Sequence, residues 1–220
     1  YPQRNWKVVS TTISAGAERC YQNMQEALHN VAQQLQKYGL KYQDVIRTWI
    51  YVGGITRFSD GVEHYEAIHL ARKNYYDRIY GKDVLTQYPA STGIGLSNRD
   101  IVIAALACKK HSFEDVSPVE NIAQVAAWNY PVHLAKVSPT FSRAYRVRTA
   151  SGSLSFISGT ASIIGADTVH IGDAQAQTEV TIDNLERVIA SSIQQPATLS
   201  PLSTIIQYVC YIKNHEDLEK

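Results

Sequence analysis

A run of small polar residues behind an apolar segment is the part of this chain best suited to contact a ligand. In the sequence Phe156-Ile-Ser-Gly-Thr-Ala-Ser-Ile-Ile-Gly165, the apolar start leads into Gly159, Thr160 and Ser162. Glycine allows a ligand to approach the backbone closely, and the two hydroxyl groups can donate or accept hydrogen bonds. The pattern therefore predicts either the wall of a binding site or a buried hairpin whose small residues only pack.

A second run of the same kind lies earlier in the chain. Ser91 and Thr92 stand directly before Gly93 and Gly95, where the backbone can come close to a ligand and present hydroxyl or amide donors. Gly93-x-Gly95 lacks the third glycine and the following helix of a dinucleotide fingerprint, and no Walker sequence is present. We therefore expect a small-molecule site that uses no nucleotide cofactor.

Metal binding is not indicated by the histidines. His64 and His69 are five positions apart, whereas neighbours on a helix face are three or four apart. A pair of metal ligands on this segment is therefore not expected. We predict no metal and no other cofactor.

Composition narrows the class of partner. The 220 residues are 45% hydrophobic and 19% charged, which is typical of a globular chain with one large or two small domains. The formal net charge is +1, from 21 basic and 20 acidic residues spread along the chain. This balance provides no basic surface for a nucleic acid or an anionic membrane. The expected partner is a small molecule.

The cysteines and the first residue give information on the cellular compartment and on the start of the chain. Cys20, Cys108 and Cys210 are odd in number and widely spaced, which favours a reducing compartment, so we expect a cytoplasmic protein. Cys108 and Cys210 fall in apolar segments and are expected in the core. No apolar run approaches the ~20 residues of a membrane span, and no signal peptide is visible. Because the chain begins at Tyr1 rather than Met, we expect further residues before it.

An internal repeat predicts the organisation of the chain. A helix over residues 18–38 and a strand over 45–52 correspond to a helix over 174–192 and a strand over 205–212. The two helices share an apolar face with the same spacing, and the copies also share an asparagine and a tyrosine. These residues are Leu28, Val31, Leu35 and Ile182, Leu185, Ile189 for the faces, Asn30 with Asn184, and Tyr51 with Tyr211.

Each copy shows what the other lacks. The first continues with a helix over 61–80, a strand over 92–108 and a polar linker over 109–120, and the second opens with a strand pair over 144–155 and 156–171. Together they predict an α+β fold of two β-β-α-β-α-β units, each a mixed sheet with helices on one face. We assign residues 1–120 to the back part of the first unit plus the linker, and 121–220 to the front part of the second. The bare sheet face requires a partner, which is either the other unit of the same chain or another copy in a trimer-like homo-oligomer.

These features resemble a known family. The element order, Ser138-Pro-Thr-Phe-Ser-Arg-Ala144 and Ser158-Gly159 resemble the RidA (YjgF) proteins. A narrower set of motifs, covering the chain from about residue 42 onward, is similar to the chorismatases, which carry two RidA-like units. That set is Arg47-Thr-Trp-Ile-Tyr51, Gly53-Gly-Ile55, Glu63-His-Tyr65, Arg72, Tyr88-Pro-Ala-Ser-Thr-Gly-Ile-Gly95, Gln124-Val-Ala-Ala-Trp-Asn-Tyr-Pro131, Ser158-Gly-Thr-Ala-Ser-Ile-Ile-Gly165 and His170-Ile-Gly-Asp173. Members are often labelled pteridine-dependent dioxygenases or deoxygenases, yet no pterin motif is visible.

The resemblance implies hydrolysis of chorismate to pyruvate and a dihydrocyclohexadiene or hydroxybenzoate acid. An enol ether breaks once its methylene carbon is protonated, which calls for a neutral carboxylic acid in an enclosed pocket. The two substrate carboxylates call for cationic donors, and we expect Arg143 to be one. The alternative for Arg143 is a surface residue paired with a nearby acid. Tyr130 is expected to bond the substrate through its hydroxyl, or else to be a core aromatic.

Other substrate-binding residues follow from the same resemblance. Gly159, Thr160 and Ala161 are expected to line the ring of the substrate, with Ser91, Thr92 and Gly93 nearby. RidA deaminases carry an arginine where this chain has Ser91, which argues against imine deamination. Ala161 is similar to the subtype that releases the dihydroxycyclohexadiene acid rather than the hydroxybenzoate.

The catalytic acid is expected outside this sequence. In the family it is a glutamate on a strand that corresponds to residues 101–105 of the first copy, and Glu216 and Glu219 stand too early to match. We therefore expect a glutamate-bearing strand beyond Lys220. The alternatives are a ligand-binding protein without turnover and, less favoured because of Ser91, a deaminase.

Overall fold

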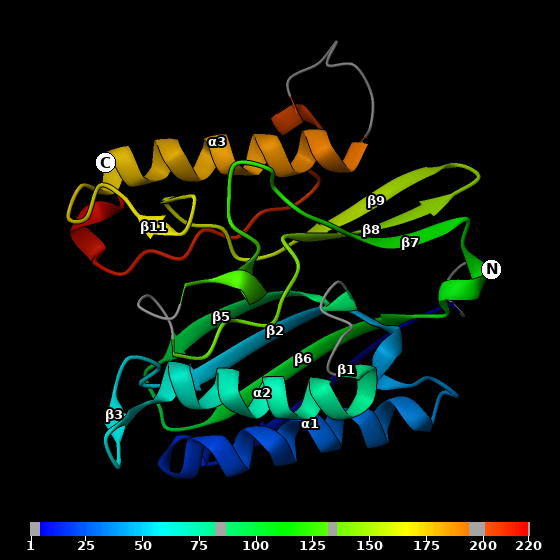
Figure 1. Ribbon diagram of the computed structural model, residues 1–220, viewed down its shortest axis with the longest axis horizontal. Coiled ribbons are helices and arrows are strands. Elements are labelled where there is room, and N and C mark those ends of the chain that lie inside the picture. Colours follow the sequence, from blue (N-terminus) through cyan, green and yellow to red (C-terminus); the bar gives the residue numbers. More distant parts are fainter. Residues whose placement is uncertain (1–4, 82–86, 132–135, 194–200, 220) are drawn as a thin grey trace.

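A computed structural model describes residues 5–81, 87–131, 136–193 and 201–219. The first half of the chain forms a four-stranded sheet with two long helices on one face, and the second half lies over the other face (Figure 1). A third long helix covers the second half on its outer side (Figure 1). Among the described residues, no helix has the length and apolar character to cross a membrane.

The sheet of the first half is mixed. Its strands are β1 (Trp6–Ile13), β2 (Val45–Gly53), β5 (Ala90–Leu96) and β6 (Ile101–Cys108), in the order β1-β6-β2-β5. Only β2 and β5 are parallel, and the helix between them provides the crossover that parallel strands require. The α+β class predicted from the sequence therefore matches this half.

Two helices bury one face of this sheet. The helix α1 (Cys20–Gln36) places Leu28, Val31 and Leu35 at 0% exposure, which confirms the predicted apolar face. The helix α2 (His64–Tyr80) begins after the hairpin of β3 (Phe58–Ser59) and β4 (Val62–Glu63). It ends at Gly81, whose φ of 88° is in the left-handed region that glycine adopts at helix ends.

The second half is a smaller three-stranded sheet under one helix. The antiparallel strands are β7 (Asp115–Val119), β8 (Ala144–Thr149) and β9 (Gly152–Ile157), covered by α3 (Ala174–Ile193). A short hairpin of β10 (Ile163–Ile164) and β11 (Asp167–Thr168) follows β9. The remaining elements are 3-10 turns at Gly16–Arg19, Tyr42–Asp44, Lys110–Ser112, Ala127–Asn129, Pro201–Thr204 and His215–Asp217.

The second half packs on the sheet face that α1 and α2 leave bare. Tyr145 and Val147 of β8 form one buried cluster with Ile46 of β2 and Leu106 of β6. This contact matches the predicted pairing of the two units within one chain at these residues. The oligomeric state stays a prediction.

The predicted strand over 205–212 is wrong. In the structure this segment has no strand and is exposed, with Ile206 at 85% and Tyr208 at 81% exposure. A strand needs a neighbour to bond its backbone, and no described strand pairs with this segment. The two tyrosines that we aligned as equivalent, Tyr51 and Tyr211, instead contact each other through their hydroxyls at 3.2 Å. Cys210 is likewise exposed rather than in the core.

Several predicted boundaries also need correction. The expected strand over 92–108 is two strands, β5 and β6, separated by a turn, and the expected polar linker contains β7. The expected strand over 144–155 is itself a hairpin of β8 and β9, which turns at residues 150–151. Gly152, the first residue of β9, has a φ of 151° that favours glycine. The buried face of α3 is centred on Asn184 and Val188, and Ile182 is 39% exposed.

One buried arginine links α3 to the smaller sheet. Arg146 on β8 bonds the Asp115 carboxylate through Nε at 3.1 Å and Nη2 at 2.7 Å, and donates from Nη1 to the Ser192 carbonyl at 3.2 Å. The apolar core here is small, built around Val119, Ala144 and Val188. The ion pair joins β7 to β8 and orients Arg146, whose bond to the Ser192 carbonyl adds a polar attachment of α3 to the sheet.

We predict that Arg146→Ala lowers the free energy of unfolding by about 2–4 kcal/mol, because it leaves the Asp115 carboxylate and the Ser192 carbonyl without their partner. Chemical denaturation measures the change. The control is Arg187→Ala on the exposed side of α3, for which we expect a change within about 0.5 kcal/mol. Equal effects of the two variants would contradict this account.

Candidate active site

The two halves of the chain meet at the amino end of β5. The Ser142 N–H donates to the Pro89 carbonyl at 3.3 Å, and the Gly159 N–H donates to the Ser91 carbonyl at 3.0 Å. Ala90 and Ser142 also form a parallel bridge. We call this contact, between residues 88–92 of the first half and residues 142–143 and 158–159 of the second, the seam.

Buried hydroxyl groups complete the seam. The Ser158 hydroxyl accepts from the Ser91 N–H at 2.8 Å and donates to the Ser142 carbonyl at 2.5 Å. The Ser142 hydroxyl donates to the Tyr88 carbonyl at 2.7 Å, and Thr48 donates to the Ser91 hydroxyl at 2.8 Å. Since buried polar groups are costly to leave unpaired, this set of bonds fixes one arrangement of the two halves.

Arg143 extends from the seam and is only 5% exposed. Its Nη2 donates at 2.9 Å both to the Tyr130 hydroxyl and to the Val125 carbonyl. The guanidinium also lies 5.4 Å from the centre of the Phe141 ring. Its Nε is buried without a hydrogen-bond partner. The side chain is thus held rigidly while one donor stays unused.

Three buried arginines near the seam lack a carboxylate partner. Besides Arg143, these are Arg47, which bonds the Thr48 carbonyl and the Thr92 hydroxyl, and Arg72, which donates to the Thr140 carbonyl at 2.7 Å. In the described part of the chain, none of the three takes part in a salt bridge. Burial lowers the pKa of Arg47 to about 10, which shows how unfavourable the charge is without a counter-ion.

Unpaired polar atoms gather around these arginines. His69, one turn before Arg72 on α2, is 4% exposed, and neither of its ring nitrogens has a partner. Its ring packs edge-on against the Tyr65 ring, with 4.2 Å between the two ring centres. Burial, with a smaller effect of the Arg72 charge, lowers the His69 pKa well below its ordinary value, so the ring is neutral. The Arg72 Nε and the Thr140 hydroxyl are also buried without partners.

Asn184 of α3 holds the loop that follows β9. Its amide Nδ2 donates to the Ala161 carbonyl at 3.1 Å and to the Ile163 carbonyl at 2.9 Å. The side chain is 4% exposed. The Gly159–Ser162 loop is therefore tied both to β5 at the seam and to α3 behind it.

Glu120 is a half-buried carboxyl group beside Arg143. Its Oε1 accepts the Arg143 backbone N–H at 3.0 Å. Burial raises the pKa of Glu120 from its ordinary 4.5 to about 7, against the opposing effects of that hydrogen bond and of the Arg143 charge. In the described segments, no group of three or more His, Cys, Asp or Glu side chains is placed to hold a metal ion.

Comparison with known proteins identifies the relatives of this chain. Residues 2–107 match the family described as chorismatase FkbO/Hyg5-like, N-terminal. A chorismatase from Streptomyces hygroscopicus is 33% identical over 214 residues, which are 94% of this chain and 60% of that protein. The chain is similar to the chorismatases over most of its length. The resemblance stated from the sequence is confirmed, and the match extends to the amino-terminal strand and helix.

Two further matches agree with this assignment. A 3-hydroxybenzoate synthase from Streptomyces hygroscopicus is 30% identical over 192 residues, 84% of this chain and 54% of that protein. A crystal structure of a chorismatase superposes with a TM-score of 0.70 at 34% identity, covering 86% of this chain and 55% of the other. The α+β fold class is thereby confirmed. The chain spans about three fifths or less of the length of these relatives.

The structure brings most of the predicted site residues to the seam. Arg143 and Tyr130 bond each other, while Ser91, Thr92 and Gly159 pack together. A Cβ atom at Gly159 would lie 3.2 Å from the Thr92 Cγ2, so glycine permits this close contact. The predicted wall around Gly159 thus lies against the second run of small residues, Ser91 and Thr92. The hydroxyl groups of Ser91 and Thr92 already bond Thr48 and Arg47.

The other predicted residues extend from this centre. The Thr160 hydroxyl donates to the Ser158 carbonyl at 3.0 Å, and Ala161 is exposed. Gly93 is exposed two positions along β5, where an added Cβ would lie 3.9 Å from the Tyr65 ring. Which of these side chains contact a substrate stays a prediction.

Sequence reasoning missed Glu120, Asn184 as a tether of the loop, and the unpaired state of His69. The motif Glu63-His-Tyr65 with Arg72 was noticed only as part of the family resemblance. Its spacing on α2 places Tyr65, His69 and Arg72 on one helix face, which is a signal that periodicity could have provided. Glu120 carried no such signal, because its burial depends on packing between distant segments.

We expect the free energy of unfolding of the parent protein to fall as the pH rises from about 4.5 to 7. We predict that Glu120→Gln removes this fall. In the parent, the folded-state pKa is raised, so the folded protein holds a proton that the unfolded chain releases, and stability falls across that range by on the order of 2 kcal/mol. Glutamine keeps an oxygen to accept the Arg143 N–H.

Thermal or chemical unfolding at pH 5, 6, 7 and 8 measures this effect. The exposed Glu114→Gln variant is the control and should keep the parent pH dependence. If Glu120→Gln keeps it as well, the Glu120 carboxyl does not titrate in this range.

Proposed function

We propose that this chain is the substrate-binding part of an enzyme that hydrolyses chorismate, with release of pyruvate and a dihydrocyclohexadiene or hydroxybenzoate acid. The names of the relatives support the reaction, and the relatives are longer than this chain. The observation that carries the proposal is the set of buried arginines without carboxylate partners. Chorismate is a dianion, and its carboxylates would supply the counter-ions that the protein lacks there.

Arg143 is the proposed carboxylate ligand. Its unused buried Nε and its rigid bonds to Tyr130 and Val125 leave a preorganised cation that loses little side-chain entropy on binding. The Tyr130 hydroxyl accepts from Arg143 and keeps its own proton free to donate to the same anion. Gly159, Thr160 and Ala161 would contact the ring of the substrate.

The reaction itself requires an acid. Protonation of the enolpyruvyl methylene carbon gives a cation at the ether carbon, water adds there, and the resulting hemiketal breaks its bond to the ring oxygen to release pyruvate. The ring keeps that oxygen as a hydroxyl group. The glutamate expected beyond Lys220 would be the proton donor.

Binding without turnover is the second candidate. The position of Glu120 favours it, because this carboxyl accepts the Arg143 backbone N–H and, among the described residues, forms no salt bridge that would direct it toward a substrate held by the guanidinium. A RidA-type deamination has less support, since Ser91 stands where that reaction requires arginine and its hydroxyl bonds Thr48.

We expect the full-length protein to release pyruvate from chorismate, and Arg143→Ala to lower kcat/KM by about 100-fold through the loss of a charge-assisted pair. A coupled lactate dehydrogenase assay measures the pyruvate. The exposed Arg187→Ala is the matched control and should behave as the parent.

The alternatives give different results in the same assay. Chorismate that binds without pyruvate release supports the ligand-binding role. If the folded protein neither binds nor cleaves chorismate, both are rejected, and if Arg143→Ala leaves kcat/KM unchanged, Arg143 is not in the site.

Product identity has its own test. Ala161 predicts the dihydroxycyclohexadiene acid, whereas one relative is named a 3-hydroxybenzoate synthase. We expect chromatography of the parent reaction to show the dihydroxycyclohexadiene acid, and Ala161→Gly to shift the product ratio toward a hydroxybenzoate because the wall recedes by one methyl group. An unchanged ratio would show that this position does not select the product.

A further inference from the structure

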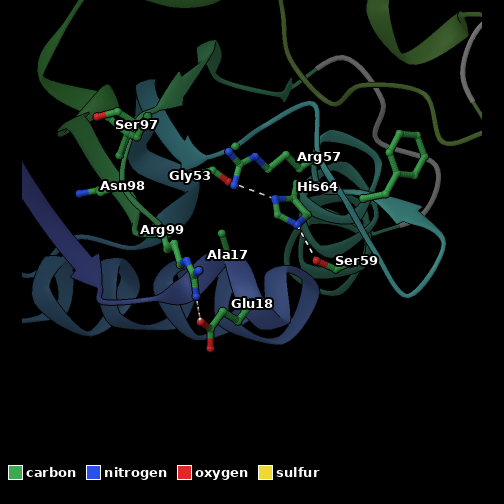
Figure 2. Close-up of a pocket in the computed structure, with 12 residues that line it drawn as sticks. Ala17, Glu18, Gly53, Arg57, Ser59, His64, Ser97, Asn98 and Arg99 are labelled. Carbon is green, nitrogen blue, oxygen red and sulfur yellow. Dashed lines mark hydrogen bonds and ion pairs between the residues drawn. The ribbon is translucent and has the colours of Figure 1, made fainter.

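A cavity of about 400 Å³ lies at the opposite end of β5 from the seam. It is enclosed by the ends of β2 and β5, the turn before β6, the β3–β4 hairpin and the turn before α1 (Figure 2). This volume is within the usual range for small-molecule sites. Since Ser91 and Leu96 mark the two ends of one strand, the cavity is separate from the candidate active site.

Two glycines shape the cavity. A Cβ atom at Gly53 would lie 2.4 Å from the Asn98 carbonyl oxygen, so only glycine lets the turn before β6 approach β2 this closely. Gly54 has a φ of 54°, and a Cβ atom there would lie 2.7 Å from the Arg57 Cδ. The Gly53-Gly54 pair therefore allows Arg57 to fold back toward the cavity.

A buried histidine fixes the rim. His64 is 6% exposed, and its Nδ1 donates to the Gly53 carbonyl at 3.0 Å while its Nε2 bonds the Ser59 hydroxyl at 2.7 Å. Because a carbonyl can only accept, the proton lies on Nδ1. These bonds tie the β3–β4 hairpin to the end of β2, so the cavity exists before any ligand arrives (Figure 2).

The two arginines and one glutamate that line the cavity leave one positive charge in excess. Arg99 Nη1 pairs with Glu18 Oε1 at 2.8 Å on one side, and Arg57 extends over the other side (Figure 2). Of the residues that the structure describes, no acidic side chain forms a salt bridge with Arg57. Apolar surface comes from Ala17, Phe58 and Leu96, and Phe58 is 70% exposed beside it.

We propose that this cavity is a second binding site, for a small monoanionic carboxylate that carries an apolar ring or chain. Arg57 binds the carboxylate through its planar fork. Phe58 and Leu96 cover the apolar part, which accounts for an exposed aromatic side chain at the mouth of a polar cavity. The proposal does not depend on the reaction at the seam.

Benzoate is the probe and benzamide is its neutral counterpart of equal shape. Isothermal titration of the full-length protein at low ionic strength, carried out in the Arg143→Ala variant to weaken carboxylate binding at the seam, should still give a benzoate site. We expect benzamide to bind at least tenfold more weakly. Equal affinity for the two probes, or no benzoate binding, would overturn the proposal.

Variants then locate the site. Arg57→Ala should weaken benzoate binding at least tenfold, whereas Arg19→Ala, which removes an exposed arginine next to the cavity that does not line it, should leave binding unchanged. Both side chains are exposed, so neither variant should unfold the protein. If both variants bind benzoate as tightly as the parent, the benzoate lies elsewhere and the assignment is wrong.

Discussion

The exchange of backbone hydrogen bonds between residues 89–91 and the second half of the chain is the constraint on which the rest of the structure depends. Ser142 and Gly159 donate across the seam, and the Ser158 hydroxyl bonds both sides at once. A helix-covered sheet and a separate small sheet become one body through these few bonds and the apolar cluster beside them. Every group with a proposed role at the active site is within a few residues of them in sequence or packs against them.

The buried arginines at the seam have different partners from the buried arginine of the smaller sheet. Arg146, which has a structural role, is paired with Asp115, whereas the guanidinium groups of Arg47, Arg72 and Arg143 bond only carbonyl and hydroxyl oxygens among the described residues. Neutral oxygens orient a guanidinium without cancelling its charge, so its positive charge stays uncompensated. Glu120 shows the other side of the same balance, because burial raises the pKa of its carboxyl to about 7 despite the adjacent arginine. These uncompensated guanidinium groups are the basis of the proposal that the site binds an anion.

The sequence predicted what local patterns control and failed where pairing partners decide. The helices α1 and α3 and the strand β2 were found because periodicity in residues such as Leu28 and Val31 is local. The apolar segment around Tyr208 has the pattern of a strand in sequence, but no strand of the described residues pairs with it and it is exposed. At the site, Arg143, Tyr130 and Gly159 were predicted through the family motifs. Glu120 and the tether from Asn184 could not be, because both depend on contacts between residues far apart in the chain.

The position of the seam also bears on the behaviour of the chain before it is fully folded. β5 is the last strand on its side of the sheet, and such a strand offers unpaired backbone groups to any other extended chain. The bridge from Ala90 to Ser142 and the Gly159 contact occupy the amino end of that edge. The hydrogen bonds that assemble the candidate site therefore also keep this edge strand from pairing with other chains. Sequence changes that loosen the seam would expose the edge of β5 as well as disturb the candidate site, so they would lower both solubility and binding.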